Sequence, residues 1–539
     1  MSDNDSRDAA DFGEYDYIVI GSGSAGGVVA ARLSERPGLR ILLLEAGPRD
    51  KSFWIHVPLG FGKTFTDPVV NWRYMGEKEP GLNGRRVYFP RGKVLGGSSA
   101  INGMLYVRGA PIDYNLWRQS GADGWSYEDV LPYFRKSEKQ ARGADPFHGD
   151  EGLLHVEDGR WTNPLADAFI ESVAACGVPR NNDFSGAAME GVGYYQSATR
   201  GGRRSSSATG FLKAAEARGN LRIETDALAT RLLFDGREAR GVLFERAGKA
   251  HIARARGEVI LAGGAINSPQ LLQLSGIGPA GLLREHGIEV LHELPGVGEN
   301  LADHLMVGRG YESDAPGSFN YMMQNRFRQG LAVAQYLLSG RGPFASGPAP
   351  AGAFLKSDPS VEEADIQVFL SAMLAEGGKL MPQNGFQIAC YVLRPQSRGH
   401  VRIKSPDPRD KAAIFANFLN AEYDRRITIA GMRMMDEFVK VDPLKSLIKR
   451  EMVPGKPLET DEEIIEFVRG AAYSAFHPVG TCKMGHDDLA VVDAELRVRG
   501  IGRLRVIDGS IMPTIASGNT SATCFMIGEK GADMVLASA

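Results

Sequence analysis

YDYIVIGSGSAGGVVAARL, residues Tyr15–Leu33, decides the fold of this chain. Its first six residues are an apolar run typical of a strand, and the residues after Gly26 have the small and apolar character of a buried helix. Between them, Gly21 permits a tight turn, Gly23 lets backbone approach a pyrophosphate, and Gly26 lets the helix pack closely. The stretch therefore predicts the first strand, loop and helix of a dinucleotide-binding unit, with the helix N-terminus facing the phosphates.

A second apolar run, Ile41–Leu44, ends at Glu45, about 20 residues beyond the glycines. An acidic side chain at this place bonds an adenosine ribose hydroxyl, and it disfavours a 2′-phosphorylated ribose because two negative groups would meet. A chain with 66 glycines offers chance matches to the short motif, but the ordered strand, helix, second strand and Glu45 favour a true site. NADP is thereby disfavoured, and FAD and NAD remain open.

The length, net charge and cysteine content limit the classes of protein to which this chain can belong. With 539 residues the chain is too long for one ordinary core, so two or more domains are expected. The net charge of −3 gives no electrostatic case for nucleic acid or an anionic membrane as partner. Four scattered cysteines without a CxxC pair favour reduced thiols, a cytoplasmic location and no metal site. Residues 1–14 are expected to be a disordered tail. No apolar stretch is long enough to span a membrane, which leaves only peripheral association with the inner membrane open.

Two further glycine-rich segments indicate which of the two candidate cofactors, FAD or NAD, the chain binds. Arg91–Gly109, RGKVLGGSSAINGMLYVRG, has small residues where backbone must approach a large, flat group. Gly264–Gly278, GAINSPQLLQLSGIG, follows an apolar strand at residues 258–262. Together these segments resemble the two signature segments of the glucose-methanol-choline (GMC) family of FAD oxidoreductases, and the resemblance extends from Tyr15 to Asp533.

The resemblance implies an α/β (α+β) protein of two domains. A Rossmann-like FAD-binding domain is expected from the discontinuous segments 15–160, 200–312 and 485–539. A substrate domain with an antiparallel sheet covered by helices is expected from residues 161–199 and 313–484. Local patterns predict a helix over 126–139 with Ser126 as N-cap, a helix from about Pro269, and a C-terminal helix from Thr520 with Asn519 as N-cap.

The resemblance also implies which residues hold FAD. Gly21–Gly26 and Glu45 would hold the ADP half, residues 91–102 the middle of the cofactor and the isoalloxazine, and Ala227 the adenine. Some relatives bond FAD covalently through a histidine in the place of Ile101; because Ile101 has no nucleophilic atom, FAD is expected to be non-covalent. The expected cofactor contacts are Gly21, Ser22, Gly23, Ser24, Ala25, Gly26, Glu45, Ala46, Arg91, Lys93, Val94, Gly96, Gly97, Ser98, Asn102, Gly103, Met104, Leu105, Ala227, Ala262, Gly263, Asp508, Gly509, Asn519, Thr520 and Ser521.

The candidate catalytic residues are His477 and Asn519. His477 lies in AFHPVGTCKMG, residues 475–485, which resembles the catalytic His-Pro segment of the family, and Asn519 follows 42 residues later. A histidine with a pKa near neutrality can accept the hydroxyl proton of an alcohol, and an amide can hold the oxygen while hydride leaves the α-carbon for flavin N5. Ser521 stands where many relatives have a second asparagine, which weakens any detailed expectation beyond Asn519.

The expected reaction is the FAD-dependent oxidation of a primary alcohol to the aldehyde, with electrons passed to a quinone or another non-oxygen carrier. The nearest resemblance is to the bacterial choline and alcohol dehydrogenase branch. Choline-specific relatives place a carboxylate shortly before a Gly-Gly-Phe-like strand, and Pro350 stands at that place here, so an uncharged alcohol is favoured. The alternatives are a choline dehydrogenase, an oxygen-using alcohol oxidase, and a lyase on the same fold (fatty-acid photodecarboxylase or hydroxynitrile lyase).

Overall fold

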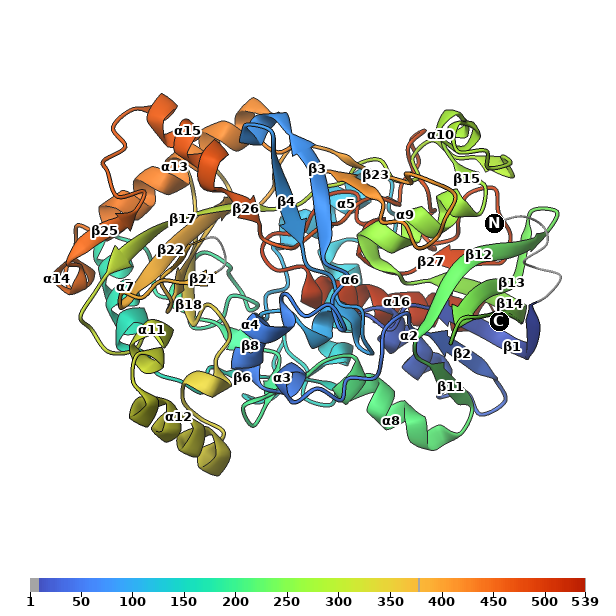
Figure 1. Cartoon of the computed structure of the whole chain (residues 1–539), viewed down its shortest axis with the longest axis horizontal. Coiled ribbons are helices and arrows are strands. Elements are labelled where there is room, and N and C mark those ends of the chain that lie inside the picture. Colours follow the sequence, from blue (N-terminus) through green and yellow to red (C-terminus); the bar gives the residue numbers. More distant parts are fainter. Residues whose placement is uncertain (1–8, 377–378, 539) are drawn as a thin grey trace.

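The computed structural model describes residues 9–376 and 379–538, and two large sheets at opposite ends of the molecule organise them (Figure 1). The strands of the first sheet are β1 (Ala10–Ile20), β2 (Ile41–Leu44), β11 (Leu221–Glu224), β12 (Ala227–Asp235), β13 (Glu238–Arg246), β14 (Lys249–Leu261) and β27 (Leu504–Val506). Their order is β11-β2-β1-β14-β13-β12, with β27 along the end of β14. β11, β2, β1, β14 and β27 pair in parallel, whereas β12 and β13 continue the sheet antiparallel. Strands from three distant parts of the chain thus build one Rossmann-like sheet, as predicted.

The first strand is longer than the sequence predicts. Residues 1–8 of the expected tail lie outside the described residues, but β1 already begins at Ala10. Residues 10–15 pair in parallel with residues 251–255 of β14, so the backbone of this polar segment gains ladder hydrogen bonds from a strand far along the chain. The expectation of a disordered tail is therefore wrong for residues 10–14.

The helix α2 (Gly26–Leu33) follows β1 directly and is almost wholly buried. A Cβ at Gly26 would overlap the carbonyl oxygen of Gly21 and approach the Cβ of Ala262 to 2.6 Å. The C-terminal helix α16 (Ser521–Ala537) packs on the other side of α2, and Gly528 meets Val28 there. Small residues thus allow strand, helix and second helix to approach one another as the fingerprint predicts.

The helix α9 (Gly264–Leu274) begins five residues before the predicted start at Pro269. Asp508 supplies the reason, because its Oδ2 accepts hydrogen bonds from Gly264 N at 2.8 Å and Ser268 Oγ at 2.6 Å. A carboxylate at a helix N-terminus satisfies free N–H groups and the helix dipole. Asp508 lies 240 residues from Ser268 in the sequence, so a pattern of neighbouring residues could not predict this helix cap.

The second sheet covers the far end of the molecule and is antiparallel. Its strands are β7 (Gly191–Tyr194), β17 (Leu305–Glu312), β18 (Ala351–Leu355), β19 (Ile366–Ser371), β22 (Gly385–Val392), β25 (Arg450–Val453) and β26 (Tyr473–Ser474). The order is β25-β17-β22-β19-β18-β7, with β26 beside β17. The sequence-based boundary at residue 312 assigns β17 to the cofactor domain, whereas β17 pairs with β22, β25 and β26. Alternating patterns identify a strand but not its neighbours, which explains this difference.

Helices and small strand pairs connect and cover the two sheets. The helix α6 (Tyr127–Ser137) begins as predicted, with Ser126 N donating to Asp129 Oδ2 at 2.9 Å in a capping box. The other helices are α3 (Phe53–His56), α4 (Phe61–Thr64), α5 (Pro111–Gln119), α7 (Pro164–Ala175), α8 (Lys213–Ala215), α10 (Ala280–Glu285), α11 (Phe319–Met323), α12 (Arg326–Ser339), α13 (Glu422–Phe438), α14 (Leu444–Leu447) and α15 (Asp461–Ala471). The small sheets contain β3 (Tyr74–Glu79), β4 (Arg85–Phe89), β5 (Glu138–Gln140), β6 (Leu154–Asp158), β8 (Gln196–Ser197), β9 (Thr199–Arg200), β10 (Arg203–Arg204), β15 (Ile277–Gly278), β16 (His292–Glu293), β20 (Ala375–Glu376), β21 (Lys379–Leu380), β23 (His400–Arg402) and β24 (Ala413–Phe415). Among the described residues, no helix has both the length and the apolar character needed to cross a membrane.

Candidate functional site

A long cleft opens at the carboxyl ends of β1, β2 and β14, where a doubly wound sheet binds its ligand. It contains about 1260 Å³ of empty space, part of it open to solvent. The predicted cofactor contacts that line this cleft are Gly21, Ser22, Gly23, Ser24, Ala25, Glu45, Ala46, Arg91, Gly97, Ser98, Ala227, Ala262, Gly263, Asp508, Gly509 and Thr520. One continuous cleft therefore gathers residues from both ends of the sequence, as a dinucleotide requires.

Glu45 closes one part of the cleft as a buried carboxylate. Its Oε2 accepts hydrogen bonds from Ser22 N at 3.1 Å and Ser22 Oγ at 2.6 Å, and its Oε1 accepts one from Gly47 N at 2.9 Å. Burial raises the pKa of Glu45, against the effect of these three donors. A carboxylate has about four acceptor positions, so one position remains for a ribose hydroxyl.

The other predicted contacts lie around the cleft rather than on its wall. Gly26 packs α2 against β1, and Gly96, with φ 94°, donates from its N–H to Ser22 Oγ at 3.0 Å. Lys93 Nζ lies 4.9 Å from the centre of the Trp72 ring, and Asn102 Nδ2 donates to Ser521 Oγ at 3.3 Å. The predicted residues that do not line the cleft are Gly26, Lys93, Val94, Gly96, Asn102, Gly103, Met104, Leu105, His477, Asn519 and Ser521.

Several cleft residues were missed by the sequence analysis. Trp72 belongs to a segment rich in aromatic residues, and its ring stacks on Tyr74 at 5.8 Å. Asn267 donates from Nδ2 to the hydroxyl of Tyr74 at 2.8 Å, although it lies in a signature segment already recognised. The missed residues with distinctive side chains are Trp72, Asn267, Gln270, Pro478 and Cys524. Among these missed residues, only Trp72 could have been suspected from the sequence, because residues 48–90 are rich in aromatic side chains.

Ile101 lies beside the cleft in a small apolar cluster with Ile55, Val70, Val94 and Ala100. Its aliphatic side chain offers no atom that could attack a flavin methyl group. This packing agrees with a cofactor that is held by contacts alone.

His477 is part of a hydrogen-bonded chain of three side chains. Asn519 Nδ2 lies 3.1 Å from His477 Nε2, and His477 Nδ1 lies 3.0 Å from His304 Nδ1. The second nitrogen of His304, Nε2, lies 2.9 Å from the carbonyl oxygen of Leu393. The sequence analysis found Asn519 and His477 and missed His304, because nothing local connects residues 173 positions apart.

The chain of contacts determines which nitrogen of each ring carries its proton. The Leu393 carbonyl can only accept, so His304 Nε2 must be the donor and, in a neutral ring, His304 Nδ1 the acceptor. His477 Nδ1 must then donate to His304, which leaves His477 Nε2 without a proton and free to accept. The free base therefore lies on the side of the ring that faces Asn519.

Both histidines are neutral in this environment. Burial lowers the pKa of His304 to about 4, and burial together with His304 and Arg91 lowers the pKa of His477 well below its ordinary value. Tyr391 stacks on the His304 ring, with centroids 4.5 Å apart and 18° between the planes. A neutral imidazole with an unprotonated ring nitrogen is the form that a general base requires.

Asp303 holds the backbone of both histidines in place. Its Oδ1 accepts hydrogen bonds from His304 N at 2.9 Å and His477 N at 2.8 Å, and its Oδ2 accepts one from the Ser474 hydroxyl. Burial raises the pKa of Asp303 to about 6, against these donors and nearby Arg91. This buried carboxylate fixes the loop through three hydrogen bonds, so Asp303 positions His477.

Asn519 is not the helix cap that the sequence predicts. α16 begins at Ser521 and its N-cap position is Thr520. Asn519 instead directs its amide nitrogen to His477, and its buried Oδ1 has no hydrogen-bond partner in the described structure. A buried acceptor without a donor is costly, so this oxygen fits a ligand that brings an O–H or N–H group.

A second group of titratable side chains, around His148, is an ion-pair network. His148 Nε2 lies 3.0 Å from Asp183 Oδ2, and its Nδ1 lies 3.0 Å from Glu138 Oε2, which also pairs with Arg108. Burial alone would lower the pKa of His148, but the two carboxylates outweigh it and raise the pKa to about 9. Asp145, His148 and Asp183 lie close together, and a metal ion bound there would have to displace the proton of His148.

Comparison with known proteins agrees with this architecture. Residues 15–306 and 395–528 match the two GMC oxidoreductase family models. The chain is 44% identical to the oxygen-dependent choline dehydrogenase of Escherichia coli over 531 residues, covering 97% of this chain and 94% of that one. It is 41% identical over 533 residues to the mitochondrial choline dehydrogenase of Mus musculus, covering 97% and 89%. The structure superimposes on pyridoxine 4-oxidase with a TM-score of 0.88 at 31% identity, covering 96% and 98%. The chain belongs to the GMC oxidoreductase family, and it is an FAD-dependent enzyme that oxidises CH–OH donors.

Proposed function

We propose that this enzyme oxidises an uncharged primary alcohol to the aldehyde, with His477 Nε2 as the general base. The observation that carries the proposal is the hydrogen-bonded chain Asn519, His477, His304, which leaves Nε2 unprotonated and directed at Asn519. An alkoxide is a far better hydride donor than an alcohol, so removal of the hydroxyl proton by a fixed base lowers the barrier. Bound FAD supplies the acceptor for the hydride that leaves the α-carbon.

Asn519 complements the base by its position. The amide donates to His477 Nε2 when no substrate is bound, and its unsatisfied Oδ1 can accept a hydrogen bond from a ligand. An alcohol oxygen between His477 and Asn519 would be oriented by both side chains, and such orientation is a major part of enzymatic rate enhancement. Non-covalent FAD would be held by the cleft residues and by the free N–H groups at the N-terminus of α2.

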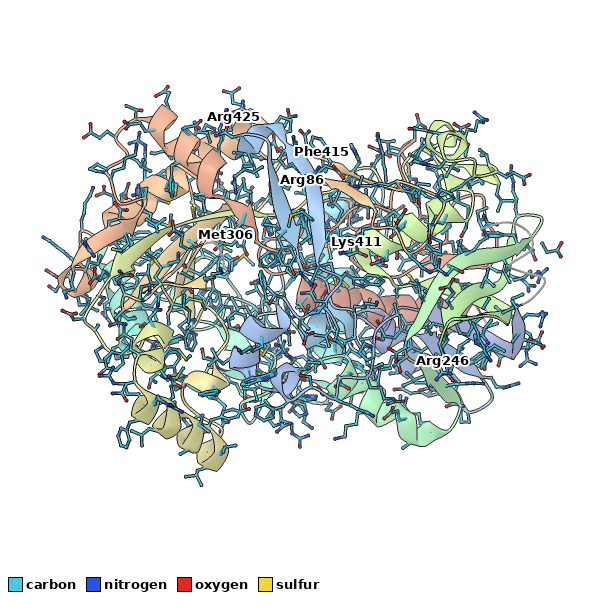
Figure 2. The ribbon with its side chains drawn as sticks, viewed as in Figure 1. Arg86, Arg246, Met306, Lys411, Phe415 and Arg425 are labelled. Carbon is cyan, nitrogen blue, oxygen red and sulfur yellow. The ribbon has the colours of Figure 1, made fainter. Side chains whose placement is uncertain are left out.

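The surroundings of the histidine pair favour an uncharged substrate. Met306 lies on β17, two residues after His304, which directly precedes this strand. It packs in an apolar cluster with Tyr391, Ala475, Phe354 and Leu393, and Figure 2 shows it on the side of the second sheet that faces the middle of the molecule. A quaternary ammonium group needs a carboxylate or an aromatic cage. No carboxylate occupies position 306 or position 350.

The second candidate substrate is choline, which the names of the two dehydrogenase relatives favour. Tyr391, Phe369 and Phe354 lie near His304 or in the same cluster and could supply aromatic faces. The discriminating pair of substrates is choline and 3,3-dimethylbutan-1-ol, which have the same shape and differ by one positive charge. We expect the neutral alcohol to have the higher kcat/KM. A higher kcat/KM for choline would contradict the proposal.

The variant Met306→Glu tests the same point from the protein side. A carboxylate on this face of β17 should raise the ratio of kcat/KM for choline to that for 3,3-dimethylbutan-1-ol by about tenfold or more, because it pairs with the trimethylammonium group. Met306→Gln is the matched control, since it adds polarity and length without charge and should leave the ratio unchanged. An equal ratio in both variants would remove position 306 from substrate selection.

We further propose that the electrons pass to a quinone or another non-oxygen carrier. A panel of alcohols assayed with an artificial acceptor and, in parallel, by oxygen uptake separates a dehydrogenase from an oxidase. The expected result is turnover with the artificial acceptor and little oxygen uptake. A lyase on this fold would not bleach the flavin absorbance on anaerobic mixing with an alcohol, so bleaching excludes that alternative.

His304 is expected to act as a positioning residue that fixes the tautomer of His477. His304→Leu removes the acceptor for His477 Nδ1–H, so the proton can move to Nε2 and block the base. We expect kcat to fall about 10–100-fold, a typical effect of losing a residue that orients a functional imidazole through a hydrogen bond. His304→Gln keeps an acceptor oxygen and should recover most of the loss. FAD content and KM measured alongside separate this effect from misfolding. Equal losses in both variants would show that His304 serves packing alone.

A further inference from the structure

The helix α12 exposes its apolar face to solvent. Phe327 is 74% exposed, Leu331 56% and Leu338 88%, although a surface helix normally directs such residues to the core. These residues and Ala334 recur at i, i+4, i+7 and i+11 and therefore share one stripe of the helix. The two buried residues of α12, Ala332 and Tyr336, lie on the opposite side. The apolar stripe thus points directly away from the protein.

The helix itself is firmly built, so the stripe is not the result of a loose segment. Asn325 Oδ1 caps its N-terminus by accepting from Phe327 N at 2.8 Å, and Gly340, with φ 62°, ends it. The Tyr336 hydroxyl donates to the Gly202 carbonyl at 3.1 Å, which ties the buried side to the rest of the domain. In Figure 1 α12 lies at the outer edge of the substrate domain.

A neighbouring element extends the apolar surface. α3 exposes Phe53 by 55% and Trp54 by 39%. Val57, directly after α3, packs with Tyr336 of α12 in one small cluster. Trp and Phe side chains are typical of proteins that contact the membrane interface.

The chain segment that contains the stripe carries positive charges only. From Ala315 to Ser357 the sequence has no aspartate or glutamate, and it has Arg326, Arg328, Arg341 and Lys356. Asp314, just before this stretch, is paired with Lys449 at 2.8 Å, and Lys356 is paired with Glu190 at 3.1 Å, so Arg326, Arg328 and Arg341 supply the local positive charge. The net charge of −3 for the whole chain therefore conceals a local region that an anionic surface would attract.

We propose that α12 docks this enzyme onto an anionic lipid membrane. Phe327, Leu331 and Leu338 enter the boundary between headgroups and acyl chains, and Arg326 and Arg341 at the two ends of the helix meet the phosphate headgroups. An amphipathic helix that lies in the plane of the interface buries its apolar face about 5–10 Å deep and gains from anionic lipids. The proposal concerns the surface alone and holds for any alcohol that the active site oxidises.

Sedimentation of the FAD-loaded full chain with vesicles tests the proposal. We expect it to sediment with vesicles of phosphatidylcholine mixed with phosphatidylglycerol, to bind less to phosphatidylcholine alone, and to dissociate as salt is added. Phe327→Ser/Leu338→Ser should lower the partition coefficient about tenfold or more. Arg326→Gln/Arg341→Gln should remove the preference for the anionic vesicles. Val69→Ser/Leu489→Ser, which truncates two exposed apolar residues elsewhere, should bind like the parent.

Each variant is checked for FAD content and for activity on a water-soluble alcohol, which should match the parent because α12 lies outside the cofactor cleft. Failure of the parent to bind vesicles, or equal binding by Phe327→Ser/Leu338→Ser, would overturn the proposal. A concentration-dependent dimer that this variant loses, without vesicle binding, would show that a second copy of the chain covers the stripe instead.

Discussion

Replacement of His477 by alanine is expected to lower the rate of flavin reduction by an alcohol about 10² to 10⁴-fold, the usual contribution of a general base. The neutral ring presents an unprotonated Nε2, and alanine leaves no group within reach of the hydroxyl proton. Stopped-flow measurement of flavin bleaching under anaerobic conditions reports this step directly. His286→Ala, at the end of α10, is the control and should reduce at the parent rate. A His477→Ala enzyme with the parent rate would remove this residue from the mechanism.

The same residue should set the acid side of the pH profile. Because burial, His304 and Arg91 lower the pKa of His477, the base stays neutral as the pH falls through 6.5, the ordinary pKa of histidine. The rate of flavin reduction should therefore stay on its plateau at that pH and fall only in more acidic solution. A midpoint at or above 6.5 would mean that bound ligands reverse the shift.

The second large effect, a loss of both stability and FAD binding, is expected for Gly26→Ala in the glycine-rich segment Gly21–Gly26. A Cβ at Gly26 would overlap the Gly21 carbonyl oxygen, so Gly26→Ala must push α2 away from β1. We expect a loss of several kcal/mol of unfolding free energy, as for other overpacked or strained core sites, and no retained FAD. Thermal unfolding and the flavin absorbance of the purified protein measure both effects.

Gly23 provides the matched comparison. A Cβ there meets no protein atom within 4 Å, because it points into the cleft. Gly23→Ala should therefore leave the stability of the apoprotein within about 0.5 kcal/mol of the parent and weaken FAD binding, since the added methyl group occupies the approach to the pyrophosphate. Equal destabilisation by the two variants would contradict this division between a packing glycine and a cofactor glycine.

The sequence predicted the parts of this enzyme that depend on neighbouring residues. The strand, loop and helix at Tyr15–Leu33 and the second strand ending at Glu45 could be recognised because each residue acts on the backbone within a few positions of itself. The start of α6 at Ser126 was predicted for the same reason. The long signature segments added the family, and with it the cofactor and the class of reaction.

The tertiary structure decided everything that depends on a partner from elsewhere in the chain. Asp508 moves the start of α9 to Gly264, and β14 draws residues 10–14 into the sheet. The proton position on His477 follows from His304 and from the Leu393 carbonyl, neither of which lies near it in sequence. The outward direction of the apolar stripe on α12 likewise depends on which face the rest of the domain covers. A sequence pattern shows that a helix has an apolar face or that a histidine is present, but the direction of a face and the tautomer of a ring are set by the atoms that surround them.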